Sequence, residues 1–153
     1  MGWRGMKKHR GAALIEFALI VPLLIFLLLG IVEFGIVVMH QLTLEQAARE
    51  GSRLAAVRNP TTEVVERITN SASILPNGSE LEIAMAYSTD NGLTYPYLLG
   101  NTAGGTNDAP PGSLVQVSVS WPHHLATGSF FGWLTGAENN TLPLHAEVVM
   151  RRE

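Results

Sequence analysis

The residues whose types and spacing suggest chemistry lie near the N-terminus. Gly11 and Ala12 are followed by Glu16, which stands at the start of an uncharged apolar run from Phe17 to Val32. An ionisable side chain in a membrane-grade segment is costly, so its presence calls for a functional reason. If the chain were cut after Gly11, Ala12 would carry a new α-amino group and Glu16 would become the fifth residue. The ammonium of one subunit and the carboxylate of its neighbour could then neutralise each other and steer assembly.

The rest of the sequence offers no catalytic constellation. It has no cysteine, and it lacks a Gly-x-Ser-x-Gly elbow, a His-Glu-x-x-His helix and a phosphate-cradling glycine loop. His123 and His124 follow Trp121-Pro122 on an expected turn, where adjacent rings rarely aim at one metal. Asp90 and Asp108 lack the clustered carboxylates of a calcium site. We therefore expect no enzyme, no cofactor and no metal site.

One short motif favours a turn rather than a site. Residues 88–95 read Ser-Thr-Asp-Asn-Gly-Leu-Thr-Tyr and match the Asp-box pattern Ser-x-Asp-x-Gly-x-Thr-Trp, with tyrosine in the last position. Asp90 can hold its own backbone in a turn and Gly92 can take a positive φ, so a hairpin is expected. A single copy does not imply the glycan-processing folds in which the pattern also occurs.

The charge distribution and the apolar segment indicate a membrane protein. Four basic residues give +4 before residue 11, and the overall charge of −3 then leaves −7 for residues 12–153. From Ala12 to Met39 there are 28 residues whose only charges are Glu16 and Glu33, and about 20 suffice to cross a bilayer as a helix. The basic flank favours a cytoplasmic N-terminus, and the acidic remainder disfavours nucleic acid as a partner. A cleavable secretory signal is less favoured because its apolar core is usually roughly 7–15 residues long.

Three polar or helix-breaking positions within this segment leave alternatives open. Glu16 and Glu33 are 17 residues apart, roughly 25 Å along a helix, so each could lie near one membrane interface. Glu33 could simply snorkel at the edge of an ordinary anchor or take part in assembly. Pro22 predicts a local break near Ala18, which is either a simple bend or a segment that stretches when a subunit leaves the bilayer.

An amphipathic helix is expected to follow the membrane segment and to end before Asn59-Pro60. Its apolar stripe comprises Leu44, Ala47, Ala48, Gly51, Leu54 and Ala55. The pairs Glu45–Arg49 and Glu50–Arg53 have the spacing of ion pairs on the polar side, where Arg49, Glu50 and Arg53 form either a solvated face or bonds between subunits. The small residues Ala47, Ala48 and Gly51 permit close approach of the head or of a partner helix.

The remaining residues predict a small α+β head. A second helix capped by Asn59 carries Val64, Val65, Ile68 and Ala72. Three strands are expected because apolar residues alternate with polar ones from Leu81 to Ser88, from Val115 to Trp121 and from Leu144 to Met150. These strands form an antiparallel sheet that the amphipathic helix covers. The stretch from Pro96 to Gly112 predicts a long exposed loop, and the apolar group Leu125, Phe130, Phe131, Trp133 and Leu134 is expected to cap the core.

Three stretches of the sequence resemble a known family. They are Arg10-Gly-Ala-Ala-Leu-Ile-Glu-Phe-Ala-Leu19 with Pro22, Gly30-Ile-Val-Glu-Phe-Gly35, and Ala47-Ala-Arg-Glu-Gly-Ser-Arg53. Together they are similar to the N-terminal signature of TadE-like proteins, over about the first third of the chain. The resemblance implies a pseudopilin or minor pilin of the tight-adherence, Flp-type pilus system. It also implies cleavage after Gly11 by a prepilin peptidase, and partnership with other pilin or pseudopilin subunits and the pilus assembly platform.

The combined prediction is a pilin-like α+β protein of the bacterial inner (cytoplasmic) membrane. Its parts are a basic leader (1–11), a transmembrane helix (12–39), an amphipathic helix extension (40–58) and an extracytoplasmic head (59–153). We expect a non-enzymatic pilus-assembly subunit that is processed after Gly11. The first alternative is a permanently anchored extracytoplasmic binding module that is never cut. A small envelope hydrolase built on the loop residues is a more remote alternative.

Overall fold

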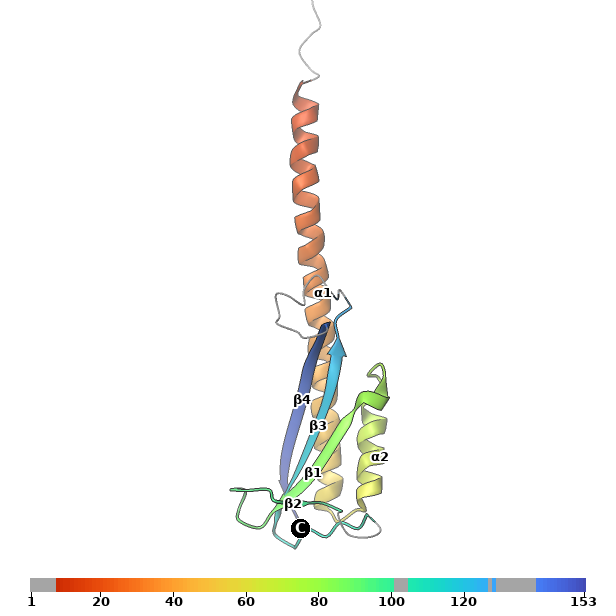
Figure 1. The fold of residues 1–153 in the computed structure, drawn as a ribbon, viewed down its shortest axis with the longest axis vertical. Coiled ribbons are helices and arrows are strands. Elements are labelled where there is room, and N and C mark those ends of the chain that lie inside the picture. The colour runs from red at the N-terminus through yellow and green to blue at the C-terminus, as the bar shows by residue number, and fades with distance from the viewer. Residues whose placement is uncertain (1–7, 101–104, 127, 129–139) are drawn as a thin grey trace, which may run out of the picture. The chain divides into compact units, whose positions relative to one another are not determined.

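The computed structural model describes residues 8–100, 105–126, 128 and 140–153, with every side chain among them except those of residues 8–10 and 12. Its helices are α1 (Lys8–Ala56), α2 (Thr61–Ser71) and the short 3-10 helix η1 (Gly78–Glu80). Its strands are β1 (Glu82–Ser88), β2 (Tyr97–Leu98), β3 (Leu114–His124) and β4 (Thr141–Arg151) (Figure 1). The chain forms two compact units, Met1–Ile36 and Val37–Glu153, so α1 contributes to both. The predicted α+β, pilin-like fold class is confirmed.

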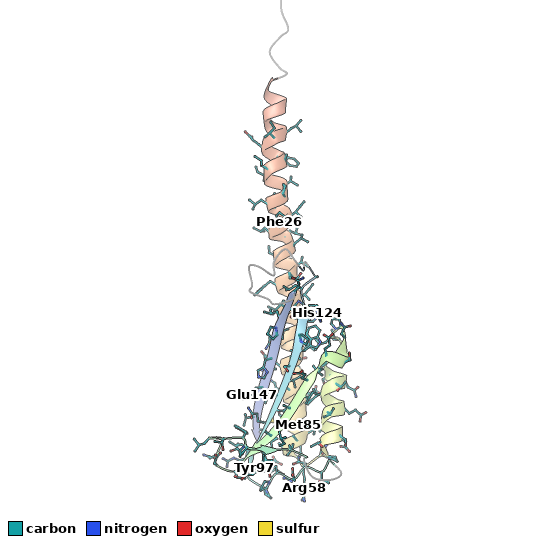
Figure 2. The ribbon with its side chains drawn as sticks, viewed as in Figure 1. Phe26, Arg58, Met85, Tyr97, His124 and Glu147 are labelled. Carbon is teal, nitrogen blue, oxygen red and sulfur yellow. The ribbon has the colours of Figure 1, made fainter. Side chains whose placement is uncertain are left out.

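The first unit is built on the N-terminal part of α1, whose apolar side chains stand out on all sides of the helix (Figure 2). Leu14, Phe17, Leu19 and Leu23 each keep 66–73% of their surface exposed. The helix runs without interruption through Pro22, so the expected local break is not seen. The physical reason is that proline removes a single hydrogen bond, while the turns on either side keep theirs.

The second unit is an antiparallel sheet of strand order β2-β1-β3-β4, with α1 and α2 packed on one face (Figure 1). Representative pairs are Met85↔Val117 between β1 and β3, and Val119↔Ala146 between β3 and β4. The three predicted strands are therefore confirmed. β2 was not predicted, because its two residues lie inside the expected loop. It pairs with β1, and Tyr97 stacks on Tyr87 with ring centroids 5.0 Å apart.

β3 is longer than expected because Pro122 does not end it. The pairing of β3 with β1 stops at Ser120, and Pro122 lies opposite Pro143 of β4. Proline has no N–H group to donate, and where β3 has no β1 neighbour this missing group removes no hydrogen bond between those two strands. His123 and His124 therefore continue the strand, and the expectation that they lie on a turn was wrong. Their side chains alternate, so His123 is buried and His124 is exposed.

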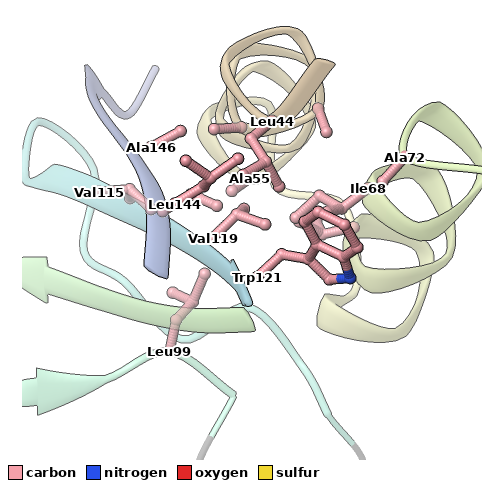
Figure 3. Packing of buried hydrophobic residues seen from close by; sticks show 14 of the residues in the cluster. Leu44, Ala55, Ile68, Ala72, Leu99, Val115, Val119, Trp121, Leu144 and Ala146 are labelled. Carbon is pink, nitrogen blue, oxygen red and sulfur yellow. The ribbon is translucent and has the colours of Figure 1, made fainter. Parts of the chain in front are cut away.

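The hydrophobic core of the second unit lies between the two helices and the sheet (Figure 3). Its fully buried side chains are Leu44, Ala47, Ala48 and Ala55 of α1, Val64 and Ile68 of α2, and Val115, Val117 and Val119 of β3, with Trp121 at 1% exposure. Each large apolar side chain removed from water contributes about 1.5–3 kcal/mol. The stripe predicted on α1 is thus the surface that carries the head.

Residues beyond β2 close the C-terminal end of α1. Asn107 is buried, and its side-chain amide donates a 2.6 Å hydrogen bond to the carbonyl of Ala55. Leu99 and Ala109 are also buried, whereas residues 96–98 and 110–112 are exposed, so the prediction of an exposed loop holds for only part of the described stretch. A helix end leaves carbonyl groups without intrahelical donors, and Asn107 supplies one of the missing donors.

α2 begins one residue later than predicted and has no side-chain cap. Its N-cap position is Pro60, so the expectation that Asn59 caps the helix was wrong. The backbone amide of Thr61 donates instead to the carbonyl of Gly105 at 2.9 Å, and the Thr61 hydroxyl donates to the same oxygen at 2.7 Å. A long-range contact therefore replaces the local cap.

The Asp-box residues form the predicted turn. The Ser88 hydroxyl donates to the Asp90 carboxylate, which also accepts bonds from the amide and hydroxyl of Thr94. The Gly92 amide donates to the Ser88 oxygen, and Gly92 has the expected positive φ of 89°. The bonds from Ser88 and then Thr94 hold the pKa of Asp90 well below its usual range. All of these bonds are internal to the loop, so the motif acts as a structural device.

Gly51 sets how closely α1 can approach α2. A Cβ atom at this position would lie 2.5 Å from both Cδ1 and Cγ1 of Ile68, and Ile68 is completely buried. We predict that Gly51→Ala lowers the free energy of unfolding. Alanine gains about 1 kcal/mol of helix propensity, but overpacking typically costs about 1–3 kcal/mol. Urea unfolding of the full chain in mild detergent, followed by near-UV circular dichroism, measures the change.

Two controls separate crowding from helix propensity. Gly35→Ala lies in the same helix where no atom would come within 4 Å of the new Cβ, so it should not lower stability. The double variant Gly51→Ala/Ile68→Val removes the Cδ1 atom that would clash, and should recover part of the loss. Equal stability of Gly51→Ala and the wild type would contradict the close-approach argument.

Arg58 occupies the backbone conformation in which helices usually place glycine. It follows α1 with a φ of 71°, and the amide of Asn59 donates back to the carbonyl of Leu54 at 3.2 Å, as in a Schellman ending. Arg152 is buried nearby, and its pKa is lowered first by burial and then by the charge of Arg58. We predict that Arg58→Gly raises the free energy of unfolding by about 1 kcal/mol, because a side chain is disfavoured in this region.

Arg58→Ala is the matched control, because it removes the same charge but keeps the Cβ atom. If backbone strain dominates, urea unfolding will show a gain for glycine and a smaller one for alanine. Equal gains for the two variants would instead assign the effect to charge repulsion between Arg58 and Arg152.

Candidate functional site

Gly11, Ala12 and Glu16 lie within α1, in the first unit. A Cβ at Gly11 would meet no atom within 4 Å, the Ala12 side chain is outside the described residues, and Glu16 is exposed. Residues four apart on a helix lie one above the other on the same face. Position 12 and the Glu16 carboxylate therefore share one face of α1, separated by about one helical turn.

The two glutamates of the apolar segment differ in their surroundings. Glu16 is exposed, whereas Glu33 keeps only 7% of its surface exposed. Pro22 is exposed between them. A helix rotates by about 100° per residue, so the 17-residue separation places the two carboxylates on different sides of α1. A single partner helix cannot meet both of them along one straight line of contact.

The second group of predicted residues forms the surface on which the head is built. Ala47 and Ala48 have no exposed surface, and Gly51 is buried beside Ile68. Arg49, Glu50 and Arg53 project from the exposed side of the same turns. These small residues were predicted to admit either the head or a partner helix. The surface that they form is covered by the chain's own α2 and sheet.

Glu50 joins α1 to α2. Its Oε2 atom accepts a 2.7 Å bond from Nε of Arg67 and a 2.9 Å bond from the hydroxyl of Ser71. The Ser71 bond, followed by the bond and charge of Arg67, lowers the pKa of Glu50. The sequence spacing suggested Arg53 as the partner, and that expectation was wrong because α2 brings Arg67 closer. Glu50 therefore stabilises the packing of the two helices within one chain.

The other predicted pair on this face is present but weak. Arg49 donates to Glu45 at 3.4 Å, and both side chains are well exposed. Pairs of this kind typically contribute about 0–1 kcal/mol. Arg53 lies in the last turn of α1, where a cation favours the helix dipole. It also lines a cleft of about 340 Å³ together with Met150, Arg151 and Glu153.

A second cleft lies beside the Asp-box loop. It has a volume of about 310 Å³ and is lined by Thr89, Asn91, Pro110 and Arg151, among others. Arg151 donates a 3.3 Å bond to the side-chain oxygen of Asn91 across one wall. None of the residues predicted to act in processing or assembly lines this cleft. Of the apolar group expected to cap the core, Leu125 is buried, while Phe130, Phe131, Trp133 and Leu134 lie outside the described residues.

Sequence reasoning missed two polar residues that belong to the head-bearing stripe of α1. Ser52 is fully buried, and its hydroxyl donates to the carbonyl of Ala48 at 2.7 Å and contacts that of Val148 at 3.3 Å. His40 is 5% exposed. The available signal was spacing, because His40 precedes Leu44 by four residues and so extends the buried stripe by one turn.

The described residues contain one helix, α1, whose stretch Ala13–Ala56 is long and apolar enough to cross a membrane. This agrees with membrane anchoring through the N-terminal helix, on grounds of length and composition.

Residues 11–53 match the model of the family described as TadE-like protein. No curated protein and no solved structure matches the chain. The matched range begins at Gly11 and ends at Arg53, so it includes the exposed apolar part of α1 and four of the six stripe residues, with Leu54 and Ala55 outside it. Residues 11–53 of this chain are therefore a TadE-like segment, joined to an α+β head that lies outside the match.

Proposed function

We propose that this chain is a non-enzymatic assembly subunit of a Tad (Flp-type) pilus, acting as a pseudopilin or minor pilin. It is inserted in the bacterial inner membrane with its N-terminus in the cytoplasm and its head outside. A prepilin peptidase cuts it after Gly11, and the mature subunit joins or primes the pilus. The observation that carries the proposal is the TadE-like match over a helix whose first part is apolar and exposed and whose second part is buried in its own head.

This division of α1 determines which surface is free for assembly. Ala47, Ala48 and Gly51 are covered by the chain's own core, and Glu50 is bonded to α2. The three small residues cannot serve another subunit without unpacking the head, and Glu50 would first have to give up its bond to Arg67. The exposed apolar side chains of residues 13–36 are the surface that lipid covers before assembly and that neighbouring helices cover afterwards. Van der Waals packing drives helix association in that setting.

Among the exposed side chains of residues 13–36, Glu16 is the one that carries a charge. Buried among apolar helices, an unpaired carboxylate is strongly unfavourable. Cleavage after Gly11 supplies the missing cation as the α-amino group of Ala12. The two groups share a face of α1, so the ammonium can reach the Glu16 carboxylate of its own chain or that of a neighbour. Pairing between neighbours would fix the axial register of one subunit on the next.

Glu33 and Pro22 have supporting roles in this proposal. Glu33 is buried, so it is less available than Glu16 to a neighbouring subunit. Pro22 leaves the carbonyl of Ala18 without its usual helical donor. We propose that the weakened turn lets the helix stretch as the subunit passes from the bilayer into the pilus. The alternative is a permanently anchored binding module that is never cut. The next two experiments distinguish it from a processed pilus subunit.

Gly11→Ala tests processing. Intact mass spectrometry of the wild-type chain extracted from cells that make the pilus should show the loss of residues 1–11. Gly11→Ala should keep the full mass, because the added Cβ lies beside the bond that is cut. Gly35→Ala is the matched control in the same helix and should be processed normally. A wild-type chain that keeps its leader in piliated cells would contradict the proposal.

Glu16→Ala tests assembly. We expect it to reduce the number of pili per cell by about tenfold or more, since a loss of about 1.4 kcal/mol per contact already changes an equilibrium tenfold. Its mass should still show cleavage. Glu16→Asp keeps the charge and should retain part of the piliation. Glu45→Gln changes an exposed glutamate and should have no effect. Normal piliation of Glu16→Ala would exclude the charge pair.

A further inference from the structure

The permanent positive charge of the second unit is carried by arginine alone. After residue 11 the sequence has no lysine, and its arginines are Arg49, Arg53, Arg58, Arg67, Arg151 and Arg152. Arg49 pairs with Glu45, and Arg67 pairs with Glu50. Among the described residues, no carboxylate lies within ion-pair distance of the other four arginines. Four cations of the head are therefore left without an ion pair in the described part of the chain.

These four arginines gather where α1 and β4 end. Arg53 is in the last turn of α1, Arg58 follows that helix, and Arg151 is the last residue of β4. Arg152 is 4% exposed and lies close enough to Arg58 for the two charges to repel each other. The amide of Glu153 donates to the last carbonyl of α1 at 3.3 Å, which holds the two ends together. Figure 2 labels Arg58 at this end of the second unit.

Arg53 and Arg151 line one cleft of about 340 Å³, which we call the arginine cleft. The other residues of its wall are Ala56, Val57, Met150 and Glu153. Two guanidinium groups and one carboxylate leave this wall with a net charge of +1. Guanidinium groups bind carboxylates in a fixed, two-pronged geometry, and the apolar part of the wall suits a short aliphatic stem. A glutamate side chain therefore matches the arginine cleft in both charge and polarity.

Two glutamates on α2 form a complementary surface, which we call the acidic face. Glu63 and Glu66 are exposed, and their spacing of three residues places them on one face of the helix. Val64 and Ile68 on the other side of α2 are buried, so the acidic face points away from the core. Arg67, four residues after Glu63, is bonded to α1 instead. In the described residues, no cation is within ion-pair distance of either glutamate.

The other carboxylates of the described head are engaged within the chain, apart from Glu153 in the arginine cleft. Those with a hydrogen bond or an ion pair are Glu45, Glu50, Glu80, Glu82, Asp90, Asp108 and Glu147. The head thus presents free positive charge at the ends of α1 and β4, and free negative charge on the outer face of α2. Charge complementarity of this kind steers association and selects the partner.

We propose that the arginine cleft of one head binds the acidic face of a second copy of this chain. The two surfaces are different, so the contact is heterologous and propagates from copy to copy instead of closing a two-fold pair. Exposed ion pairs are individually weak, but copies anchored in one membrane or one pilus meet at a high effective concentration. The inference extends the proposed function, because it names the contact between neighbouring heads.

Disulfide crosslinking between two full-length chains tests the contact. The wild-type sequence has no cysteine, so an introduced thiol has no competitor. Val57→Cys places a thiol in the wall of the arginine cleft. Asn70→Cys places one at an exposed position of α2, four residues after Glu66 and on the same face. An N-terminal tag on one of the two chains separates the mixed dimer from the two equal dimers on a gel.

The two chains are reconstituted together in phosphatidylcholine vesicles at about 50 mM salt and then oxidised. We expect the mixed dimer to exceed either equal dimer by about tenfold, because only the mixed pair joins the cleft to the acidic face. Raising the salt to about 500 mM should remove most of this excess, since exposed charges are then screened.

Ile74→Cys is the matched control for Val57→Cys. Ile74 is 69% exposed and Val57 is 53% exposed, so the control thiol is at least as accessible, but it does not line the arginine cleft. Mixed with Asn70→Cys, it should give no excess of the mixed dimer at either salt concentration.

Charge reversal tests which residues make the contact. Introduced into both cysteine chains, Arg53→Glu/Arg151→Glu should lower the mixed dimer by about tenfold, and so should Glu63→Arg/Glu66→Arg. The fourfold variant reverses both surfaces and should recover the mixed dimer. This recovery cannot come from a loss of stability, because the fourfold variant contains every change that the two double variants make.

Several results would overturn the proposal. They are a mixed dimer no more abundant than with Ile74→Cys, a mixed dimer that neither salt nor either double reversal reduces, and a fourfold variant that folds without recovering it. Protection of Val57→Cys from a soluble thiol reagent only in phosphatidylglycerol vesicles would assign the cleft to a lipid headgroup instead. The measurement needs neither cleavage nor pili, so its failure would leave the Gly11 and Glu16 experiments unaffected.

Discussion

The second unit depends on how closely α1 approaches α2 and the sheet. At Gly51 no side chain separates the helix backbone from Ile68, and at Ala47 and Ala48 only a methyl group does. Larger residues would push the helix outward and separate it from Val117 and its neighbours on β3. Close packing is therefore what allows so short a chain to build a core without a disulfide bond, since the sequence has no cysteine.

Small residues permit a close approach but do not select one position along the helix axis. That selection comes from polar groups at the same interface. Ser52 bonds the carbonyl of Val148, Glu50 bonds Arg67, and Asn107 bonds the carbonyl of Ala55. If α1 slid by one turn, the buried Asn107 would lose its partner, at about 1–3 kcal/mol for an unsatisfied group, and the exposed Glu50 would lose its bond to Arg67. The alanine and glycine positions set the distance of α1 from the head, and the polar positions set its register.

Local patterns in the sequence carried enough information for most of the fold and part of the candidate site. Alternating residues identified β1, β3 and β4, and the three- and four-residue spacing identified the buried stripe. What failed were features made by contacts between distant segments. Arg67 bonds Glu50 across 17 residues of sequence, and Asn107 bonds Ala55 across 52 residues. The two residues of β2 form a strand because they pair with β1. Local turn signals at Pro122 pointed to a loop, and the structure shows that the strand continues in its pairing with β4 after the pairing with β1 has ended.

The same reasoning explains why Glu16 was recognisable and His40 was not. A carboxylate in an apolar run conflicts with its surroundings in the sequence itself. His40 sits at the end of that run, where a polar residue is expected. Its four-residue spacing to Leu44 was the local sign of burial, but its partner His123 lies on a strand that was predicted to have ended. Its partner is 83 residues away. A polar residue can be recognised from the sequence when its immediate neighbours in the chain are apolar. When its partner is distant in the sequence, the structure is needed to find it.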